Sequence, residues 1–403
     1  MSISQTCPFT ILCVASYHKG DEFIRECQRQ GCHVLLLTSL SVGRDVWPLE
    51  SIDEIFLMPD VEKKWNMEDV IKSVSFLARD RVINRIVPLD DFDLEKAATL
   101  REHLRTPGMG ETTTRYFRDK LAMRMQAQEA GINVPEFIHV LNHERLREFA
   151  ACTPAPWVLK PRFEASAVGI QKIRAAEELW PALEQLGDRQ SFFVLERFVP
   201  GDIYHIDSIV DDQQVIFAIA NRYGQPPLNV AHEGGVFSTC TIERGTPDEQ
   251  ALQAINRRVL SAMGLRRGVS HTEFIKGRAD RQFYFLETSA RVGGANIAEL
   301  IEAATGINLW TEWAKLEVRR DYKLPTPRAD YAGLLVSLAR QEYPDTSRYN
   351  DPEIVWRMNK SAHAGLIVKS PSLARVEQLI DDYTARFSND FLATLPAPEK
   401  AVS

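Results

Sequence analysis

The segment FYFLETSARVGGANIAEL spans Phe283 to Leu300 and joins a strand pattern to a charged turn. Its first four residues are aromatic or aliphatic, as in a buried strand, and the run ends at the carboxylate of Glu287. Ser289 and Arg291 follow at every second position, which places these three side chains on one face. Two glycines then let the backbone approach a ligand closely before a helical pattern begins. The segment therefore predicts a strand end that carries chemistry.

The overall composition limits the class of protein. The chain has 403 residues, 44% of them hydrophobic and 26% charged, and a net charge of −7. This length predicts about two to four subdomains, and the acidic balance argues against a general nucleic-acid binder. The six cysteines are scattered without zinc spacing, which predicts reduced, buried thiols. We see no leader pattern and no apolar run of about eighteen residues, so we expect a soluble cytoplasmic protein without membrane contacts.

The first part of the chain alternates strands and helices. Nearly continuous apolar runs at 9–16, 32–39, 52–59 and 83–91 are typical of strands covered on both faces of a parallel sheet. Helical patterns occupy 19–31 and 67–80. Residues 1–110 are therefore predicted to form a small doubly wound domain. The first loop has one glycine and lacks the G-x-G-x-x-G fingerprint, which argues against a dinucleotide site and an oxidoreductase.

Helical periodicity returns after a turn-rich connector. In the helix expected at 115–131, Phe117, Leu121 and Met125 form a predicted apolar stripe and Gly131 a predicted stop. Further helices are expected at 176–187, 296–320 and 373–387. The segment 156–173 is expected to form two strands joined by a loop, and 191–223 several strands joined by short turns. Single strands are expected at 332–340 and 363–370. We interpret Leu309, Trp313 and Leu316 as a core stripe. The sequence KLPTPRAD marks a domain boundary near residue 323.

Several strand ends carry charged residues. Lys160 ends a strand before a loop of small residues, where backbone N–H groups and an ammonium suit phosphate oxygens. Glu196 ends another strand before a Pro-Gly turn, as in a hinge that binds adenine. Glu273 and Glu287 on neighbouring strands supply oxygen ligands for a hard cation, and Arg291 suits developing negative charge. Taken singly, each pattern has a structural alternative: a solvated lysine, an edge hairpin or a Glu–Arg ion pair.

Together these residues carry a family resemblance over nearly the whole chain. The order Lys120, Lys160, Glu196, Glu273, Glu287, Arg291 resembles the ATP-grasp superfamily of carboxylate–amine ligases and their carboxylase relatives. The matching motifs are RDKLAMRMQAQEAGINVPEF, PWVLKPRFEASAVGI, LERFVPGD and HTEF…FLETSARVGG. The segments IEAATGINLWTEWAKLE and HAGLIVKS are most similar to the L-amino-acid ligase type.

The resemblance implies an α/β protein, with α+β character in the ATP-grasp part. It implies a Rossmann-like domain (1–110), a connecting helix (111–133), a mobile lid subdomain (134–195), a central subdomain with the metal site (196–322) and a C-terminal subdomain (323–403). It also implies a homodimer that uses ATP and Mg²⁺, with Mn²⁺ as the alternative cation.

Site residues follow from the same resemblance. For the nucleotide it implies Lys120, Lys160, Ser166, Gly169, Glu196, Phe198, Val199 and Asp202. For the metal it implies Glu273, Glu287 and Ser289. For the small-molecule substrates it implies His232, Gly234, Gly235, His271, Arg291, Gly293 and Gly294, with Arg291 and Lys160 in catalytic roles.

The chain departs from the family pattern at three places. Ser289 stands where the family usually has an asparagine metal ligand. Ala165 and Ala167 replace common lid glycines, and the ribose glutamate after the hinge is missing, which leaves Asp202 or Asp207 as substitutes.

The implied reaction activates a carboxylate as an acyl phosphate and couples it to an amine, with release of ADP and phosphate. The alternatives are an ATP-grasp carboxylase or phosphotransferase with another oxyanion acceptor, and an ATP-binding regulatory protein without turnover.

Overall fold

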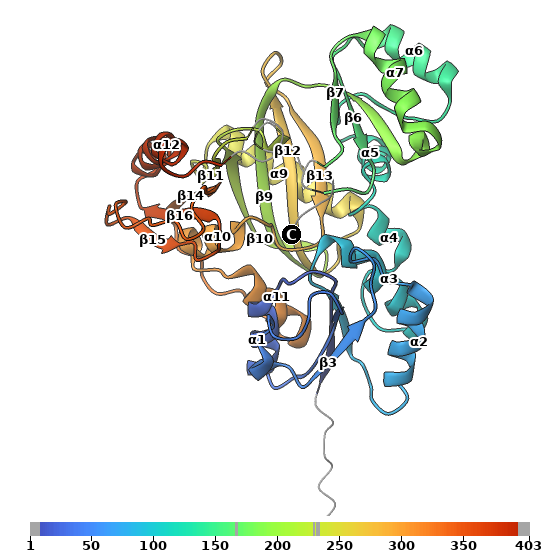
Figure 1. Cartoon of the computed structure of the whole chain (residues 1–403), viewed down its shortest axis with the longest axis vertical. Coiled ribbons are helices and arrows are strands. Elements are labelled where there is room, and N and C mark those ends of the chain that lie inside the picture. The colour runs from blue at the N-terminus through green and yellow to red at the C-terminus, as the bar shows by residue number, and fades with distance from the viewer. Residues whose placement is uncertain (1–8, 166–167, 229, 231–233, 394–403) are drawn as a thin grey trace, which may run out of the picture.

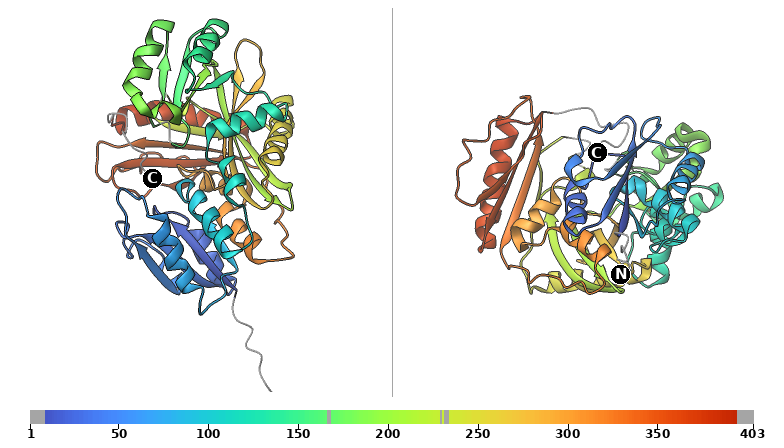
Figure 2. Two further views of the ribbon diagram at one scale, coloured as in Figure 1. Left: turned by 90° about the vertical axis from the view of Figure 1, so that its right-hand side faces the viewer. Right: turned by 90° about the horizontal axis from the view of Figure 1, so that it is seen from below.

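The computed structural model describes residues 9–165, 168–228, 230 and 234–393. These residues form one parallel sheet, one four-stranded antiparallel sheet and one eight-stranded antiparallel sheet. In Figure 1 the parallel sheet lies at the bottom of the molecule, the small antiparallel sheet at the upper right, and the C-terminal strands at the left. Figure 2 shows the small sheet and the parallel sheet at opposite ends.

The N-terminal sheet is doubly wound, as the sequence predicts. Its order is β3-β2-β1-β4, and every neighbouring pair is parallel. The strands are β1 (Thr10–Ala15), β2 (His33–Ser39), β3 (Glu54–Met58) and β4 (Arg85–Pro88), and the helices are α1 (Asp21–Arg29), α2 (Met67–Leu77) and α3 (Leu94–Leu104). Every residue of β1 is buried, because alternate side chains enter hydrophobic clusters on opposite faces. Helix α3 was not among the predicted elements.

Two helices occupy the connector: α4 (Glu111–Arg115) and α5 (Lys120–Glu129). Asp119 caps α5 by accepting hydrogen bonds from the backbone N–H groups of Leu121 and Ala122. The predicted apolar stripe is wrong at Met125, which is 58% exposed. Because α5 begins only at Lys120, its buried face carries Met123, Arg124 and Ala127 beside Leu121. Gly131 has φ +65°, which agrees with the predicted helix stop.

The small antiparallel sheet has its own core. Its order is β5-β8-β6-β7, from β5 (Phe137–His139), β6 (Trp157–Pro161), β7 (Gln171–Ile173) and β8 (Phe193–Arg197). Helices α6 (His143–Cys152) and α7 (Ala176–Leu186) accompany it. Trp157, Leu159, Leu179 and Leu195 belong to one buried cluster within this unit. We call residues 134–195 the lid.

The large sheet joins the central and C-terminal segments. Its order is β13-β12-β9-β10-β11-β14-β16-β15. The strands are β9 (Gly201–Asp211), β10 (Gln214–Tyr223), β11 (Phe237–Thr241), β12 (Gly268–Gly277), β13 (Phe283–Ser289), β14 (Tyr331–Leu338), β15 (Ile354–Arg357) and β16 (His363–Ser370). The helices are α9 (Pro247–Met263), α10 (Ile297–Thr305), α11 (Leu309–Val318) and α12 (Leu373–Asp390). Since β11 pairs with β14, the C-terminal strands extend the central sheet.

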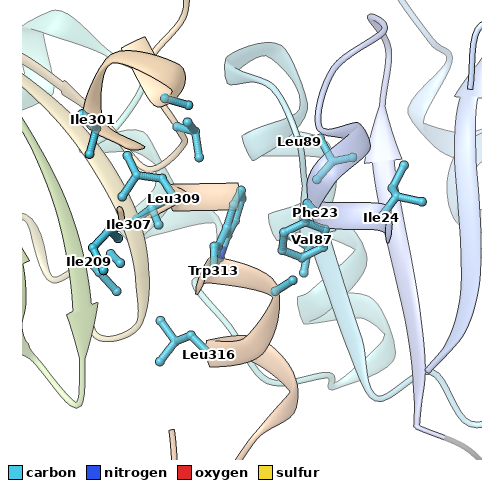
Figure 3. Close-up of a cluster of buried hydrophobic side chains, with 14 of the residues drawn as sticks. Phe23, Ile24, Val87, Leu89, Ile209, Ile301, Ile307, Leu309, Trp313 and Leu316 are labelled. Carbon is cyan, nitrogen blue, oxygen red and sulfur yellow. The ribbon is translucent and has the colours of Figure 1, made fainter. Parts of the chain in front are cut away.

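One hydrophobic cluster joins the N-terminal domain to the central sheet. Trp313 of α11 is 3% exposed, and its ring lies 4.9 Å from the Phe23 ring of α1, centroid to centroid. Figure 3 shows Trp313 between Leu309 and Ile307 on one side and Phe23 and Val87 on the other. Leu309, Trp313 and Leu316 are all buried, which confirms the predicted core stripe.

The five described cysteines are free, and Cys152 is exposed rather than buried as predicted. Within the described part of the chain, no helix has the length and apolar character needed to cross a bilayer.

Candidate active site

A cavity of about 460 Å³ lies where the lid meets the central sheet and helix α5. It brings together six of the charged residues singled out in the sequence: Lys120, Lys160, Glu196, Glu273, Glu287 and Arg291. Phe198, Val199, His271 and Gly294 line it as well. Pro227, Leu228, Val230 and Phe237 add apolar walls from the segment between β10 and β11.

Two carboxylates face each other across β12 and β13, the strand pair at one edge of the large sheet. Glu273 of β12 and Glu287 of β13 are direct antiparallel partners, beside a bulge at Leu286 of β13. Like charges at this position repel, so they require cations nearby. The Lys120 ammonium lies 3.0 Å from Glu287 Oε2, and the Tyr223 hydroxyl donates a 2.8 Å hydrogen bond to Glu273 Oε1. Paired carboxylate oxygens of this kind are the donor set that fits a hard divalent cation.

The two lysines reach the cavity from different elements. Lys120 is the first residue of α5, and its ammonium also donates to the Glu164 carbonyl at 2.6 Å. Lys160 lies in β6, with its ammonium 2.8 Å from Glu196 Oε2. Burial, followed by the nearby Arg124 charge, outweighs Glu196 and lowers the pKa of Lys160 to about 8. Both ammonium groups therefore lie in a buried, partly neutralised setting.

Arg124 is a site residue that sequence reasoning missed. Its side chain is fully buried, and its Nε lies 2.9 Å from Glu196 Oε1. It also donates to the Leu286 carbonyl, one residue before Glu287. Burial alone would raise the pKa of Glu196, but Arg124 and Lys160 outweigh it and lower that pKa. Arg124 thus connects the end of β8 to strand β13, which carries Glu287. Its position four residues after Lys120, on the same helix face, was the available signal.

The hinge after β8 has few free donors. The backbone N–H groups of Arg197 and Phe198 donate to the Glu136 and Pro156 carbonyls, at 2.8 and 3.0 Å. Both Glu196 oxygens contact cations. The expected contact between the Glu196 carboxylate and an adenine amine therefore competes with these ion pairs.

Ser289 and Arg291 meet a carboxylate from the N-terminal domain. The Ser289 hydroxyl donates to Asp91 Oδ1, and Arg291 Nη2 lies 3.2 Å from Asp91 Oδ2. Burial would raise the pKa of Asp91, but Arg291, Arg118 and the Ser289 hydrogen bond hold it well below the usual range. Ser289 does not line the cavity. The predicted metal-ligand hydroxyl is thus occupied by Asp91, the last residue of the predicted strand run 83–91, for which no role was predicted.

A buried imidazole–carboxylate network lies behind β12. Asp207 accepts from His271 Nδ1 at 2.8 Å and from His205 Nδ1 at 2.7 Å. Burial lowers the pKa of His271, but Asp207 outweighs it and raises that pKa to about 9. The raised pKa favours the protonated imidazole near neutral pH. Since each Asp207 oxygen already contacts one imidazole, the cluster is satisfied by its own hydrogen bonds.

The ribose substitutes suggested by the sequence lie elsewhere. Asp202 has a side chain that is 46% exposed and faces Arg278, and Ile203 lines the cavity in its place. Asp207 is held in the histidine network. Gly169, Gly234, Gly235 and Gly293 do not line the cavity. Ser166 and His232 lie outside the described residues.

Part of the chain matches known proteins in sequence. Residues 153–299 match the model of the ATP-grasp domain. The L-arginine-specific L-amino acid ligase of Bacillus subtilis is 23% identical over 279 residues, which cover 68% of this chain and 66% of the relative. The match thus spans slightly less than two thirds of that relative's length.

Two solved structures extend the similarity to nearly the whole chain. The L-amino acid ligase of Bacillus licheniformis superposes with a TM-score of 0.73 at 18% identity, covering 96% of this chain and 99% of that protein. The ADP complex of N5-carboxyaminoimidazole synthetase from Staphylococcus aureus gives 0.71 at 15% identity, covering 94% and 97%. Residues 153–299 therefore match an ATP-grasp domain, and the chain as a whole shares the fold of these two solved enzymes.

Proposed function

We propose that this protein is an ATP-dependent ligase that activates a small carboxylate as an acyl phosphate and couples it to an amine. The observation that carries the proposal is the convergence of Lys120, Lys160, Glu273, Glu287 and Arg291 in one cavity. Simple nucleotide binding does not require two lysines, two opposed carboxylates and an arginine together. The similarity to an L-arginine-specific L-amino acid ligase supports the same class of reaction.

The chemistry of the lining residues supports a proposed role for each of them. Glu273 and Glu287 would hold Mg²⁺, or Mn²⁺, because their carboxylates are cross-strand partners that line the cavity. Lys120 and Lys160 would neutralise the nucleotide phosphates. Phe198 and Val199 would lie against adenine, since they line the cavity at the hinge. Bound MgATP supplies the phosphoryl group that activates the substrate carboxylate.

The residues of the chain then act mainly by charge and position. Nη1 and Nη2 of Arg291 are held by the Val292 carbonyl and by Asp91, whereas its Nε has no partner among the described residues. The orientation of this guanidinium is thus fixed before substrate arrives, and it would stabilise negative charge as it develops on the reacting group. Lys160, buried in strand β6 of the lid, would keep its charge when phosphate oxygens replace part of its Glu196 contact.

A carboxylase or phosphotransferase with another oxyanion acceptor is the second candidate. It is favoured by the fold similarity to N5-carboxyaminoimidazole synthetase, whose TM-score nearly equals that of the L-amino acid ligase. A nucleotide-binding protein without turnover is the third candidate.

One assay separates these candidates. The protein is incubated with MgATP, a pool of amino acids and small carboxylates, and hydroxylamine, which traps an acyl phosphate as a hydroxamate. Hydroxamate formed in step with ADP supports the ligase. ADP release that depends on bicarbonate alone supports the carboxylase. Neither product, from protein shown to bind ATP, overturns the ligase proposal.

The domain boundaries, the oligomeric state and the location are also part of this proposal. We propose the lid, connector and domain boundaries given above, a homodimer in solution, and a cytoplasmic location. The free thiols of all five described cysteines support a reducing compartment.

A further inference from the structure

A second cavity, of about 390 Å³, lies between the N-terminal domain and the central sheet. Its walls come from β4, α3, the connector turn at 107–110, the turn between α9 and β12, and α11. Ala290 lines it, although the adjacent residues Ser289 and Arg291 bond to Asp91. The two cavities therefore lie on opposite sides of the same strand end, and they share no lining residue.

The charges of this second cavity are mostly positive. Four arginines line it: Arg85, Arg101, Arg266 and Arg267. Among its described lining residues, Glu317 is the one acidic residue. The whole chain carries a net charge of −7, so composition does not explain this local excess. Four cations around one cavity repel each other unless an anion lies between them.

Arg101 is the deepest of these cations. It is 8% exposed, and its Nε and Nη2 donate to the Ile86 carbonyl at 2.8 and 2.6 Å, while Nη1 donates to the Met109 carbonyl at 3.3 Å. No carboxylate of the described residues lies within 4 Å of the Arg101 guanidinium. Burial lowers its pKa to about 10. A buried guanidinium that contacts only carbonyl dipoles is stabilised further by a true counter-anion.

The other charged residues of the cavity do not supply a counter-anion for Arg101. Arg85 Nε lies 3.5 Å from Glu317 Oε2, and the other Glu317 oxygen accepts from Trp313 Nε1 at 3.1 Å. Arg267 pairs with Asp211 at 3.1 Å. The exposed Arg266 side chain has no ion pair or hydrogen bond to any described residue. Arg101 and Arg266 therefore remain without a carboxylate partner.

The connector turn at 107–110 forms part of the wall of this cavity. Gly108 has φ +141°, and a Cβ on it would lie 2.6 Å from Arg101 Nε. Glycine is required there, since only glycine lets the backbone lie against the guanidinium. Leu94, Met109, Leu265 and Trp313 add apolar contact area. Both the volume and this mixed lining are typical of small-molecule sites, which measure about 300–1,000 Å³.

We propose that this interdomain cavity binds a small organic dianion, a phosphate ester or a dicarboxylate, as a second ligand separate from the substrates. Its anionic groups lie between Arg101, Arg266 and Arg267, and its carbon skeleton lies against Trp313. Since the ligand contacts the N-terminal domain, the connector and the central sheet at once, it stabilises the junction that carries Asp91, Ser289 and Arg291.

Isothermal titration calorimetry tests the proposal with the full chain. The first cavity is filled with Mg²⁺ and a non-hydrolysable ATP analogue, and the probes are inorganic phosphate, phosphoglycolate and succinate. We expect at least one probe to bind with a Kd below about 1 mM. Preference for phosphoglycolate or for succinate distinguishes the phosphate ester from the dicarboxylate.

Variants assign the binding to its cavity. The double variant Arg266→Ala/Arg267→Ala is expected to bind the probe about tenfold more weakly or worse, because charge-assisted hydrogen bonds are lost. Arg257→Ala, an exposed arginine that lines neither cavity, is the matched control and retains binding. Absence of binding by all three probes overturns the proposal. Binding that survives in the double variant but vanishes in Arg291→Ala also overturns it, because the anion then occupies the first cavity.

Discussion

The Asp91 carboxylate of the N-terminal domain lies 3.2 Å from the Arg291 guanidinium of the central sheet, 200 residues away in the chain. Both side chains are largely buried, and Arg118 approaches the same carboxylate at 3.8 Å. One carboxylate therefore neutralises two arginines at the contact between domains. Removal of its charge leaves both cations in a low-dielectric setting.

Asp91→Asn keeps the size of the side chain and removes this charge. We expect the free energy of unfolding to fall by about 3 kcal/mol, because buried cations lose their partner. Denaturant titration followed by circular dichroism measures the change. Asp80→Asn, at an exposed position, is the control and should leave stability within about 0.5 kcal/mol of wild type. Equal stability of the two variants would show that solvent already screens the Asp91 pair.

Glu287→Ala removes one of the two opposed carboxylates. We expect turnover to be lost and the dependence of nucleotide affinity on Mg²⁺ to disappear, since Glu273 alone leaves the cation with half its protein ligands. ADP release and ATP binding with and without Mg²⁺ check both effects. Glu184→Ala, on the exposed face of α7, should behave as wild type. Full activity in Glu287→Ala would end the metal-ligand assignment.

Lys160 should make nucleotide affinity depend on pH. Its pKa of about 8 means that the ammonium is charged below that pH and increasingly neutral above it. Phosphate oxygens favour the charged form, so binding takes up a proton at higher pH and affinity falls by up to about tenfold per pH unit. Kd for ATP measured from about pH 7 to about pH 9.5 checks the slope.

Two substitutions control that measurement. Lys160→Arg stays charged throughout this range, so the slope should vanish. Lys160→Ala should bind ATP more weakly at every pH. An unchanged slope in Lys160→Arg would assign the titration to another group.

Gly293→Ala tests the histidine network without altering any charge. An alanine Cβ at this position would lie 2.9 Å from Asp207 Oδ1 and 3.0 Å from His271 Nδ1. We expect a loss of about 1–3 kcal/mol in the free energy of unfolding, because these buried groups must shift. Gly294→Ala is the matched control, since nothing lies within 4 Å of its Cβ. If thermal unfolding shows equal stability for both variants, the network tolerates displacement.

Local pattern predicted the charged strand ends but not their partners. Glu273 and Glu287 are recognisable because each lies at or near a strand pattern, and the structure pairs them across β12 and β13. Asp91 and Arg124 were missed because their contacts reach 198 and 72 residues along the chain, which no local periodicity records. Asp91 does follow a parallel strand at its carboxyl end, where such sheets place ligand-binding residues, and this was the signal available.

The errors have physical causes as well. Met125 was assigned to a buried stripe because i, i+4 spacing continues from Phe117, but the buried face of α5 is centred on Lys120, Arg124 and Ala127, so Leu121 lies at its edge and Met125 outside it. Asp202 was offered as a ribose ligand because it follows the hinge, whereas strand alternation in β9 turns Ile203 into the cavity instead. Spacing along the chain is reliable only when the first residue of the element is known.

The Phe23–Trp313 contact has a consequence for how the molecule opens. Because these rings belong to one hydrophobic cluster, the N-terminal domain and the central sheet should unfold as one cooperative unit, whereas the lid, with a core of its own, should open at a lower free energy. In native-state hydrogen exchange, amides of β1 and β12 would then share a single high protection level, and those of β6 would exchange earlier. A graft of residues 9–110 from a relative would have to bring its own partner for Trp313, so we expect this domain to be exchangeable only together with α11.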